Sequence, residues 1–481
     1  MFRPKRATAA LLTLSTLAAC SSSASRTDGT PFTTGASPAS SSPAPVPATP
    51  GVDLADPLFP GLGNPGIDVQ HYDLRFAVDP ETDRAEGSLT MQVRLTEARS
   101  EITLDARGPV VEAVVVDGGR VEQWQDDGEV HIPLPGVTPP GTVLDIELRY
   151  GVDLEAGSAI PGIPAGWIET AGGSYVLAEP EGARRLFPCN DHPSDKATWS
   201  FEISVPSGLT AVANGEFLGA RADGASSLWR WQEDDPMATY LLLLVVGDYE
   251  IVESTGPGGL PFVSAVLRRD LELVGPALDS MAAQVEFFEQ WFGPYPLDRY
   301  GLAITDSPGG LAMETQGRSL FSRDDLLGPN PDEALLAHEL AHQWFGNAVT
   351  LADWGDIWLN ESFATYGEWM WTEQIGRASV QESAEFGLTL RTVRATAEPT
   401  VDDMFGINSY DGGAVVLHAL RLTVGDEQFF EILRRWVSDN VGGSASTEQF
   451  VELAEEISGQ DLTEFFATWL FSGVVPDRFP V

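Results

Sequence analysis

Two histidines four residues apart, His338 and His342, place the strongest constraint on how this chain can fold. Residues four apart share one face of an α-helix, so both imidazoles can reach one metal ion while Glu339 faces the open side of that ion. The alternative is a solvated helix face without a metal, but the chain has only six histidines and a chance pairing is rare. The spacing therefore predicts a helix that carries a two-histidine metal site.

The residues around this pair predict where the helix begins and ends. Asn330 is expected to cap the N-terminus, Pro331 to occupy the first helical position and Glu333 to complete a capping box. Apolar residues then carry the helix through His342 to a stop near Gly346.

Glu361, which follows His342 after 18 residues, is the best candidate for a third ligand. A third histidine at the positions used by metzincins is absent, because Phe345 and Ala348 occupy the corresponding places. Residues 353–356 read as a loop, and an apolar pattern at helical spacing begins at Glu361 and runs to Gln374. Glu361 could instead be a first-turn glutamate favoured by the helix dipole. Two histidines and one carboxylate would leave an open position on one Zn²⁺ per chain, which is typical of a catalytic site.

These motifs together resemble the aminopeptidase N type of zinc metallopeptidase, a gluzincin family with the same five-residue motif, gap and following Trp-Leu-Asn-Glu segment. The resemblance extends to Glu179–Asp191 and Leu311–Thr315 and covers most of the chain beyond its first 60 residues. It implies an N-terminal all-β domain, a twisted β-sandwich or saddle, followed by a thermolysin-like α+β catalytic domain that is mainly helical. It also implies release of single residues from peptide N-termini.

The chemistry of such a site needs a base and a donor to the oxyanion. Zinc lowers the pKa of a coordinated water to about 7, so Glu339 needs only modest basicity to act as general base. Tyr410 matches the tyrosine of the family by its place before a helix expected from Val415 to Leu422. Tyr366, on the helix that begins at Glu361, is the rival, and a buried tyrosine is commonly just part of the core.

An exopeptidase must also recognise the free amino end of its substrate. Glu314 and Glu179 align with the two acidic family positions that bind this ammonium ion, and Ala312 and Met313 align with the neighbouring substrate-binding segment. In a chain with 71 acidic residues, either glutamate could equally be a solvated surface charge.

The chain departs from the family pattern at three places. Leu311 replaces a glycine, Thr315 replaces an asparagine, and His192 stands where a glutamate is common. His192 has no evident partner as a second metal ligand. These departures bear on substrate preference and leave the zinc ligands intact.

The N-terminus resembles a bacterial lipoprotein signal. Arg3, Lys5 and Arg6 precede an apolar run from residue 7 to 19, too short to span a bilayer, which ends at Cys20. We expect residues 1–20 to be a signal peptide whose removal leaves an acylated Cys20, with ordinary signal cleavage as the alternative. Residues 21–60, rich in Ser, Ala and Pro, read as a disordered tether. The protein is then exported and lipid-anchored to the outer face of the bacterial cell membrane.

The rest of the chain changes character once, near residue 255. Short alternating runs over residues 61–255, such as 72–76, 88–93 and 143–148, predict a β domain. Longer helical runs over residues 256–481, such as 278–292 and 428–437, predict the catalytic domain.

Charge limits the set of partners. The formal net charge of −43 makes nucleic acid an unexpected partner and would draw in basic peptides, although solvation of the surface alone explains such a charge. The oligomeric state is open, with a monomer favoured.

Three functions remain. The first is a zinc aminopeptidase acting on peptides with free N-termini, and the second is an endopeptidase or dipeptidase using the same zinc site. The third is a peptide- or metal-binding lipoprotein without catalysis. The presence of Glu339 favours an enzyme, because a binding protein needs no general base.

Larger family members carry a further helical domain, so we expect a more open cleft in a chain that stops at Val481.

Overall fold

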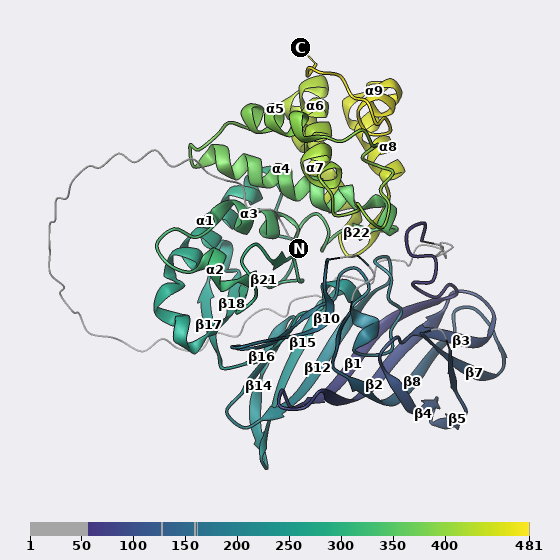
Figure 1. The fold of residues 1–481 in the computed structure, drawn as a ribbon. Coiled ribbons are helices and arrows are strands. Elements are labelled where there is room, and N and C mark those ends of the chain that lie inside the picture. The colour runs from purple at the N-terminus through teal and green to yellow at the C-terminus, as the bar shows by residue number, and fades with distance from the viewer. Residues whose placement is uncertain (1–55, 127, 158–159, 161, 481) are drawn as a thin grey trace, which may run out of the picture.

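A computed structural model describes residues 56–480, with the exception of 127, 158–159 and 161. The predicted signal peptide, its lipidation site Cys20 and nearly all of the predicted tether lie outside the described residues. The described chain forms a β-rich part and a mainly helical part, which lies above the first in Figure 1. This arrangement confirms the predicted combination of a β domain and a largely helical catalytic domain.

The largest element of the β-rich part is an eight-stranded sheet with the strand order β14-β15-β12-β1-β2-β8-β4-β5. Within this sheet only β1 and β12 pair in parallel, and the other neighbours are antiparallel. In β8 exposed and buried residues alternate from Val143 to Leu148, because one face of the sheet packs on the core. The three predicted strands lie within β1, β2 and β8 and are confirmed. The strands are β1 (Ile67–Val78), β2 (Arg84–Leu95), β4 (Val110–Val116), β5 (Gly119–Val121), β8 (Val143–Asp153), β12 (Lys196–Pro206), β14 (Glu216–Asp223) and β15 (Ser226–Ala238).

Two smaller sheets complete this part. One has the order β3-β7-β6 and the other the order β13-β16-β11-β10-β9. Every residue of β13 and β16 is buried, which explains why these strands read as continuous apolar runs and do not alternate. The strands are β3 (Arg99–Asp105), β6 (Trp124–Asp126), β7 (Glu129–Thr138), β9 (Ala156–Gly157), β10 (Ala165–Thr170), β11 (Gly173–Leu177), β13 (Thr210–Ala213) and β16 (Leu244–Gly247).

A further five-stranded sheet, in the order β17-β18-β19-β21-β20, opens the second part. Its strands are β17 (Tyr249–Thr255), β18 (Pro261–Leu267), β19 (Leu302–Thr305), β20 (Ala312–Met313) and β21 (Ser319–Ser322). The expected domain boundary at residue 255 falls between β17 and β18, which pair along their whole length. β17 is therefore joined to the sheet of the second part, and the short strand β20 forms the opposite edge.

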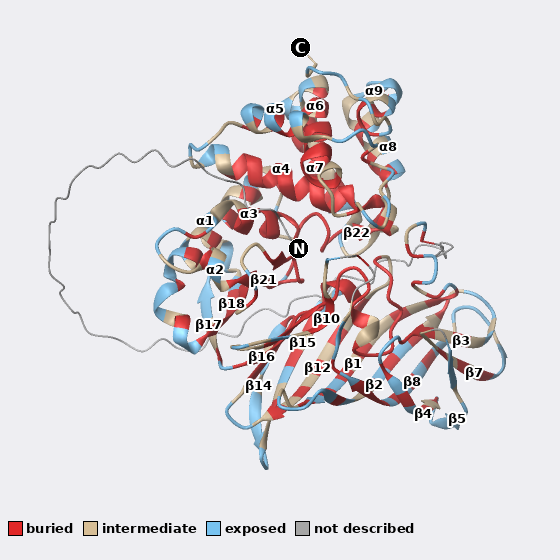
Figure 2. Cartoon of the chain, viewed as in Figure 1, coloured by how far each residue is buried: buried red, intermediate tan, exposed pale blue. Residues whose placement is uncertain are grey.

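The helices of the second part surround two buried ones. α3 and α4 are buried along most of their length, whereas α5 and α9 present exposed faces, as Figure 2 shows. The predicted helices at residues 278–292 and 428–437 lie within α1 and α7 and are confirmed. Among the described residues no helix has the length and apolar character needed to cross a membrane. The helices are α1 (Gly275–Phe292), α2 (Arg323–Leu326), α3 (Glu333–Ala341), α4 (Trp358–Gln374), α5 (Val380–Leu390), α6 (Gly413–Val424), α7 (Asp426–Asn440), α8 (Thr447–Ser458) and α9 (Thr463–Trp469). Two short strands, β22 (Thr350–Leu351) and β23 (Ser444–Ala445), pair in parallel between them.

The predicted ends of the metal-site helix were wrong. Asp332, and not Asn330, caps α3, because its side chain accepts a hydrogen bond from the backbone N–H of Leu335 at 3.2 Å. The regular helix ends at Ala341, five residues before Gly346. Beyond it the backbone bonds tighten to a spacing of three residues, as between Gln343 and Leu340, so the chain leaves the helix before it reaches the glycine.

Candidate active site

α3 and α4 bring the three predicted metal ligands together in the interior. The Nε2 atoms of His338 and His342 lie 3.2 Å apart. One carboxylate oxygen of Glu361 lies 3.3 Å from the first and 3.6 Å from the second. Ligands bound at 2.0–2.1 Å around a tetrahedral ion stand about 3.3 Å from each other. The three side chains therefore form one triangular face of such a tetrahedron.

The chemistry of these donors fits a zinc ion. Both carboxylate oxygens of Glu361 are buried without a hydrogen-bond partner, and so are both oxygens of Glu314 and one oxygen each of Glu179 and Glu339. Buried carboxylates without partners are costly unless a cation or a proton compensates them. Two imidazole nitrogens and one carboxylate oxygen match a catalytic zinc site with one open position.

Two further groups orient the histidines, and the sequence analysis missed both. Nδ1 of His342 lies 3.1 Å from the backbone oxygen of Phe345, and Nδ1 of His338 lies 3.6 Å from a carboxylate oxygen of Glu368. Such outer partners fix the ring and leave Nε2 for the metal. Glu368 follows Glu361 by seven residues, which places both on one face of α4 and is the signal that could have revealed it.

Glu339 lies inside the same cluster. It is buried, and its carboxylate shares a group with Glu314 and His342 whose ligand atoms all lie within 4.8 Å of one another. Burial raises the pKa of Glu339 to about 7, although the neighbouring histidines favour its charged form. A carboxyl group with a pKa in this range can both accept and deliver a proton near neutral pH.

Glu314 and Glu179 converge on the metal triad from other elements. Together with Glu361 they form a buried group whose oxygens all lie within 4.8 Å. Burial, together with the charges of Glu314 and Glu361, raises the pKa of Glu179 well above its ordinary value. Ala312 and Met313 form the edge strand β20 directly before Glu314. The structure thus gathers a metal face and an acidic face around one interior point.

The three residues that depart from the family pattern have contacts of their own outside the metal triad. The side chain of Leu311 is part of the hydrophobic core, with 2% of its surface exposed. The hydroxyl of Thr315 donates to the backbone oxygen of Arg318. Nδ1 of His192 lies 2.7 Å from the hydroxyl of Ser194, and burial lowers the pKa of His192 to about 4. His192 belongs to none of the metal-ligating groups among the described residues.

The structure separates the two candidate tyrosines. Tyr410 lies in a short π-helix, Asn408–Gly412, and its ring stacks at 18° on the imidazole of His338 with centroids 5.9 Å apart. The hydroxyl of Tyr366 instead lies 3.3 Å from Nδ1 of His418 and 3.3 Å from Nη1 of Arg421. Tyr410 is therefore the tyrosine placed beside a metal ligand.

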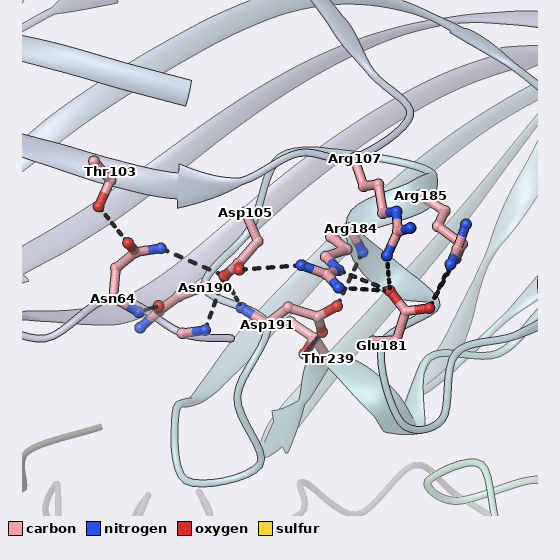
Figure 3. Close-up of polar contacts among 11 residues, drawn as sticks. Asn64, Thr103, Asp105, Arg107, Glu181, Arg184, Arg185, Asn190, Asp191 and Thr239 are labelled. Carbon is pink, nitrogen blue, oxygen red and sulfur yellow. Dashed lines mark hydrogen bonds and ion pairs between the residues drawn. The ribbon is translucent and has the colours of Figure 1, made fainter. Parts of the chain in front are cut away.

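A polar network in the β-rich part anchors the loop that delivers Glu179 (Figure 3). The guanidinium of Arg184 donates to Glu181 at 2.8 Å, and its backbone N–H donates to Asp191 at 3.1 Å. Asp191 also accepts from the hydroxyl of Thr239 at 2.6 Å. The segment from Glu181 to Asp191, directly after Glu179, is thus held by hydrogen bonds of Arg184 and Thr239.

Comparison with known proteins assigns the chain to a family. Residues 276–469 match the Peptidase family M1 domain, and residues 68–241 match the Peptidase M1 N-terminal domain. An M1 zinc metallopeptidase from Deinococcus radiodurans is 34% identical, with a TM-score of 0.82 over 88% of this chain and 98% of that one. The chain belongs to the peptidase M1 family. This confirms the predicted resemblance, and the zinc cofactor is confirmed at the level of the family.

Other M1 proteins differ from this one in length. Aminopeptidase M1 of Arabidopsis thaliana is 32% identical over 60% of this chain and 36% of its own length. Leucyl aminopeptidase of Saccharolobus solfataricus is 27% identical over 84% of this chain and 53% of its own length. The chain thus spans between about a third and a half of these curated M1 relatives. A variant of the Deinococcus enzyme bound to a Tyr-Ser-Ala substrate is 33% identical, with a TM-score of 0.79.

Proposed function

We propose that this M1 protein is a zinc aminopeptidase, which removes residues one at a time from the free amino end of peptides. The observation that carries the proposal is that the buried carboxylates of Glu179 and Glu314 converge on Glu361, one of the three metal ligands. Both oxygens of Glu314 and one oxygen of Glu179 are buried without a hydrogen-bond partner, so beside the metal ligands they provide a place for an ammonium ion one residue away from the bond to be cut. This arrangement favours an exopeptidase over an endopeptidase.

Each side chain then has a distinct task. His338, His342 and Glu361 hold the zinc, which when bound polarises water and the substrate carbonyl. Glu339, buried beside the metal ligands, accepts a proton from the attacking water and delivers it to the leaving amine. Tyr410 donates a hydrogen bond to the oxyanion from its place beside His338. Glu179 and Glu314 bind the substrate ammonium, and the edge strand of Ala312 and Met313 pairs with the substrate backbone.

Amino-acid arylamides test this proposal with one readout. We expect hydrolysis of the substrate with a free amine, no hydrolysis of its acetylated twin, and loss of activity in Glu339→Ala. Glu452→Ala, an exposed residue on α8, is the matched control and should behave as the unchanged protein. Equal hydrolysis of both substrates would favour the endopeptidase. A protein without any Glu339-dependent hydrolysis would be a binding protein.

We also propose that the protein is exported and held at the outer face of the cell membrane by acyl chains on Cys20. The support is the charged, apolar and Leu-Ala-Ala-Cys pattern of residues 3–20. Labelled fatty acid should enter the full chain and the membrane fraction in a bacterial host, and Cys20→Ser should abolish both. Labelling that persists in Cys20→Ser would contradict the proposal.

A further inference from the structure

Lys196 is the only lysine among the described residues, and it stands at the start of β12 in the β-rich part. Within the part of the chain that the structure describes, its ammonium forms no ion pair. It donates to the backbone oxygens of Asn347 and Ala348 at 2.8 and 3.0 Å. These oxygens belong to the loop that follows the helix of the zinc ligands, so a side chain of one part holds the backbone of the other.

The same loop is held by a second donor from the β-rich part. The hydroxyl of Tyr240 donates to the backbone oxygen of Gly346 at 2.6 Å. Gly346 has a φ of 123°, and a Cβ there would lie 3.1 Å from the side chain of Asn360 and 3.3 Å from Nδ1 of His342. Three successive carbonyls are therefore fixed from outside the helical part, at a point where the backbone packs against a zinc ligand.

The loop passes this constraint on to Glu314. The side-chain amide of Asn347 donates to the backbone oxygen of Glu314 at 2.6 Å, and that of Gln343 donates to the same oxygen at 3.1 Å. Lys196 thus bonds the backbone of Asn347, and the side chain of Asn347 bonds the backbone of Glu314, which links Lys196 to Glu314 through one residue. Glu314 directly follows β20, the edge strand that pairs with β21, so these two amides hold its backbone at the point where the strand ends.

We propose that Lys196 is a positioning residue for the recognition of the substrate amine. It sets the place of the Glu314 carboxylate through the loop Gly346–Ala348, and so couples the β-rich part to the choice between free and blocked N-termini. The proposal rests on the aminopeptidase function proposed above.

Removal of the ammonium tests the proposal. In Lys196→Met the carbonyl of Asn347 loses its donor, whereas that of Ala348 keeps the backbone N–H of Gly442 at 2.7 Å. Asn347 then shifts, and the ammonium site opens. We expect KM for free-amine peptides to rise by about tenfold with kcat changed by less than about threefold, and the preference for free over acetylated substrates to fall. Lys196→Gln can still donate to one carbonyl, so its KM should lie between those of the unchanged protein and Lys196→Met. It provides the test if Lys196→Met does not fold.

A matched control separates positioning from stability. Thr210→Val removes another buried hydrogen bond of the β-rich part, from the Thr210 hydroxyl to the backbone oxygen of Tyr249 at 2.9 Å. It should lower the melting temperature without a change in KM or in amine preference. If Thr210→Val changes KM and amine preference as much as the Lys196 variants do, Lys196 is merely structural and the inference fails.

A double-mutant cycle tests the path itself. If Lys196 acts through Asn347, Lys196→Met should change KM far less in an Asn347→Ala background than in the unchanged protein. Additive effects would contradict the path. If the unchanged protein does not distinguish free from blocked amines, the proposed function is overturned. If it does distinguish them but KM is unaltered in the Lys196 variants, only this inference is overturned.

Discussion

Tyr410 is the residue of the site whose proposed task depends on a hydroxyl and not on a charge. Its ring lies on His338, so Tyr410→Phe keeps the stacking and removes only the donor to the oxyanion. Loss of one such donor typically lowers kcat by about 100- to 1000-fold. We therefore expect this fall in kcat with little change in KM, measured on a free-amine arylamide.

Tyr366→Phe is the natural comparison, because it removes a hydroxyl from the same core. That hydroxyl bonds His418 and Arg421 and lies in a different polar cluster. The variant should lose some stability and keep its kcat. A larger loss of kcat in Tyr366→Phe than in Tyr410→Phe would show that the wrong tyrosine has been chosen.

Residues within one helix or at fixed spacing could be read from the sequence, and residues that meet only after folding could not. His338 and His342 were predictable because helix geometry alone puts them on one face. The contacts of Lys196 could not be predicted, because its acceptors lie 151 and 152 positions away along the chain. Glu368 lies seven residues after Glu361 on α4, but only the folded structure shows that this spacing places it beside His338.

At the scale of elements, the approach of the π-helix to α4 positions Tyr410. The hydroxyl of Ser362 on α4 donates to the backbone oxygen of Ser409 at 2.7 Å. A Cβ at Gly413, the first residue of α6, would lie 1.8 Å from that hydroxyl. Gly413→Ala should force the two elements apart and lower the free energy of unfolding by about 1–3 kcal/mol, as measured by chemical denaturation.

Two variants check the cause of that loss. Gly275→Ala, at the start of α1, places its Cβ where no heavy atom lies within 4 Å and should be close to neutral. Ser362→Ala combined with Gly413→Ala should recover part of the stability, because it removes the nearest of the clashing atoms. No recovery in the double variant would mean that the Cβ of residue 362, which would lie 2.7 Å away, and not the hydroxyl, resists the extra methyl group.

The limits of prediction at this scale lie in local hydrogen bonding. The existence of α3 and α4 followed from periodicity, but the choice between Asn330 and Asp332 as the cap of α3 depends on which side chain reaches the N–H of Leu335. The residues of the π-helix around Tyr410 show no apolar periodicity, so the sequence indicated only that they precede a helix.

At the scale of the whole molecule, buried acids make stability depend on pH. Burial and the neighbouring Asp105 raise the pKa of Asp191 to about 7 from an ordinary value of 3.8. Its contribution is fully present below pH 4 and is lost as the pH rises to about 7, because the unfolded chain ionises first. Asp191→Asn should therefore reduce the loss of stability between pH 5 and pH 8 by on the order of 2 kcal/mol.

Denaturation curves at both pH values measure this effect. Asp153→Asn is the control, since its side chain is 71% exposed, and it should leave the difference between the two pH values unchanged. If Asp191→Asn shows the same loss of stability as the unchanged protein, other buried acids account for the dependence.

The union of the two parts around one acidic, metal-binding centre is the central claim. Mass spectrometry of an eight-residue peptide over time tests it most directly, beside the acetylated peptide and Glu339→Ala. The account predicts a ladder of products, each shorter by one residue from the free amino end, with no products from the acetylated peptide or the variant. Internal fragments, or equal cleavage of the acetylated peptide, would contradict it.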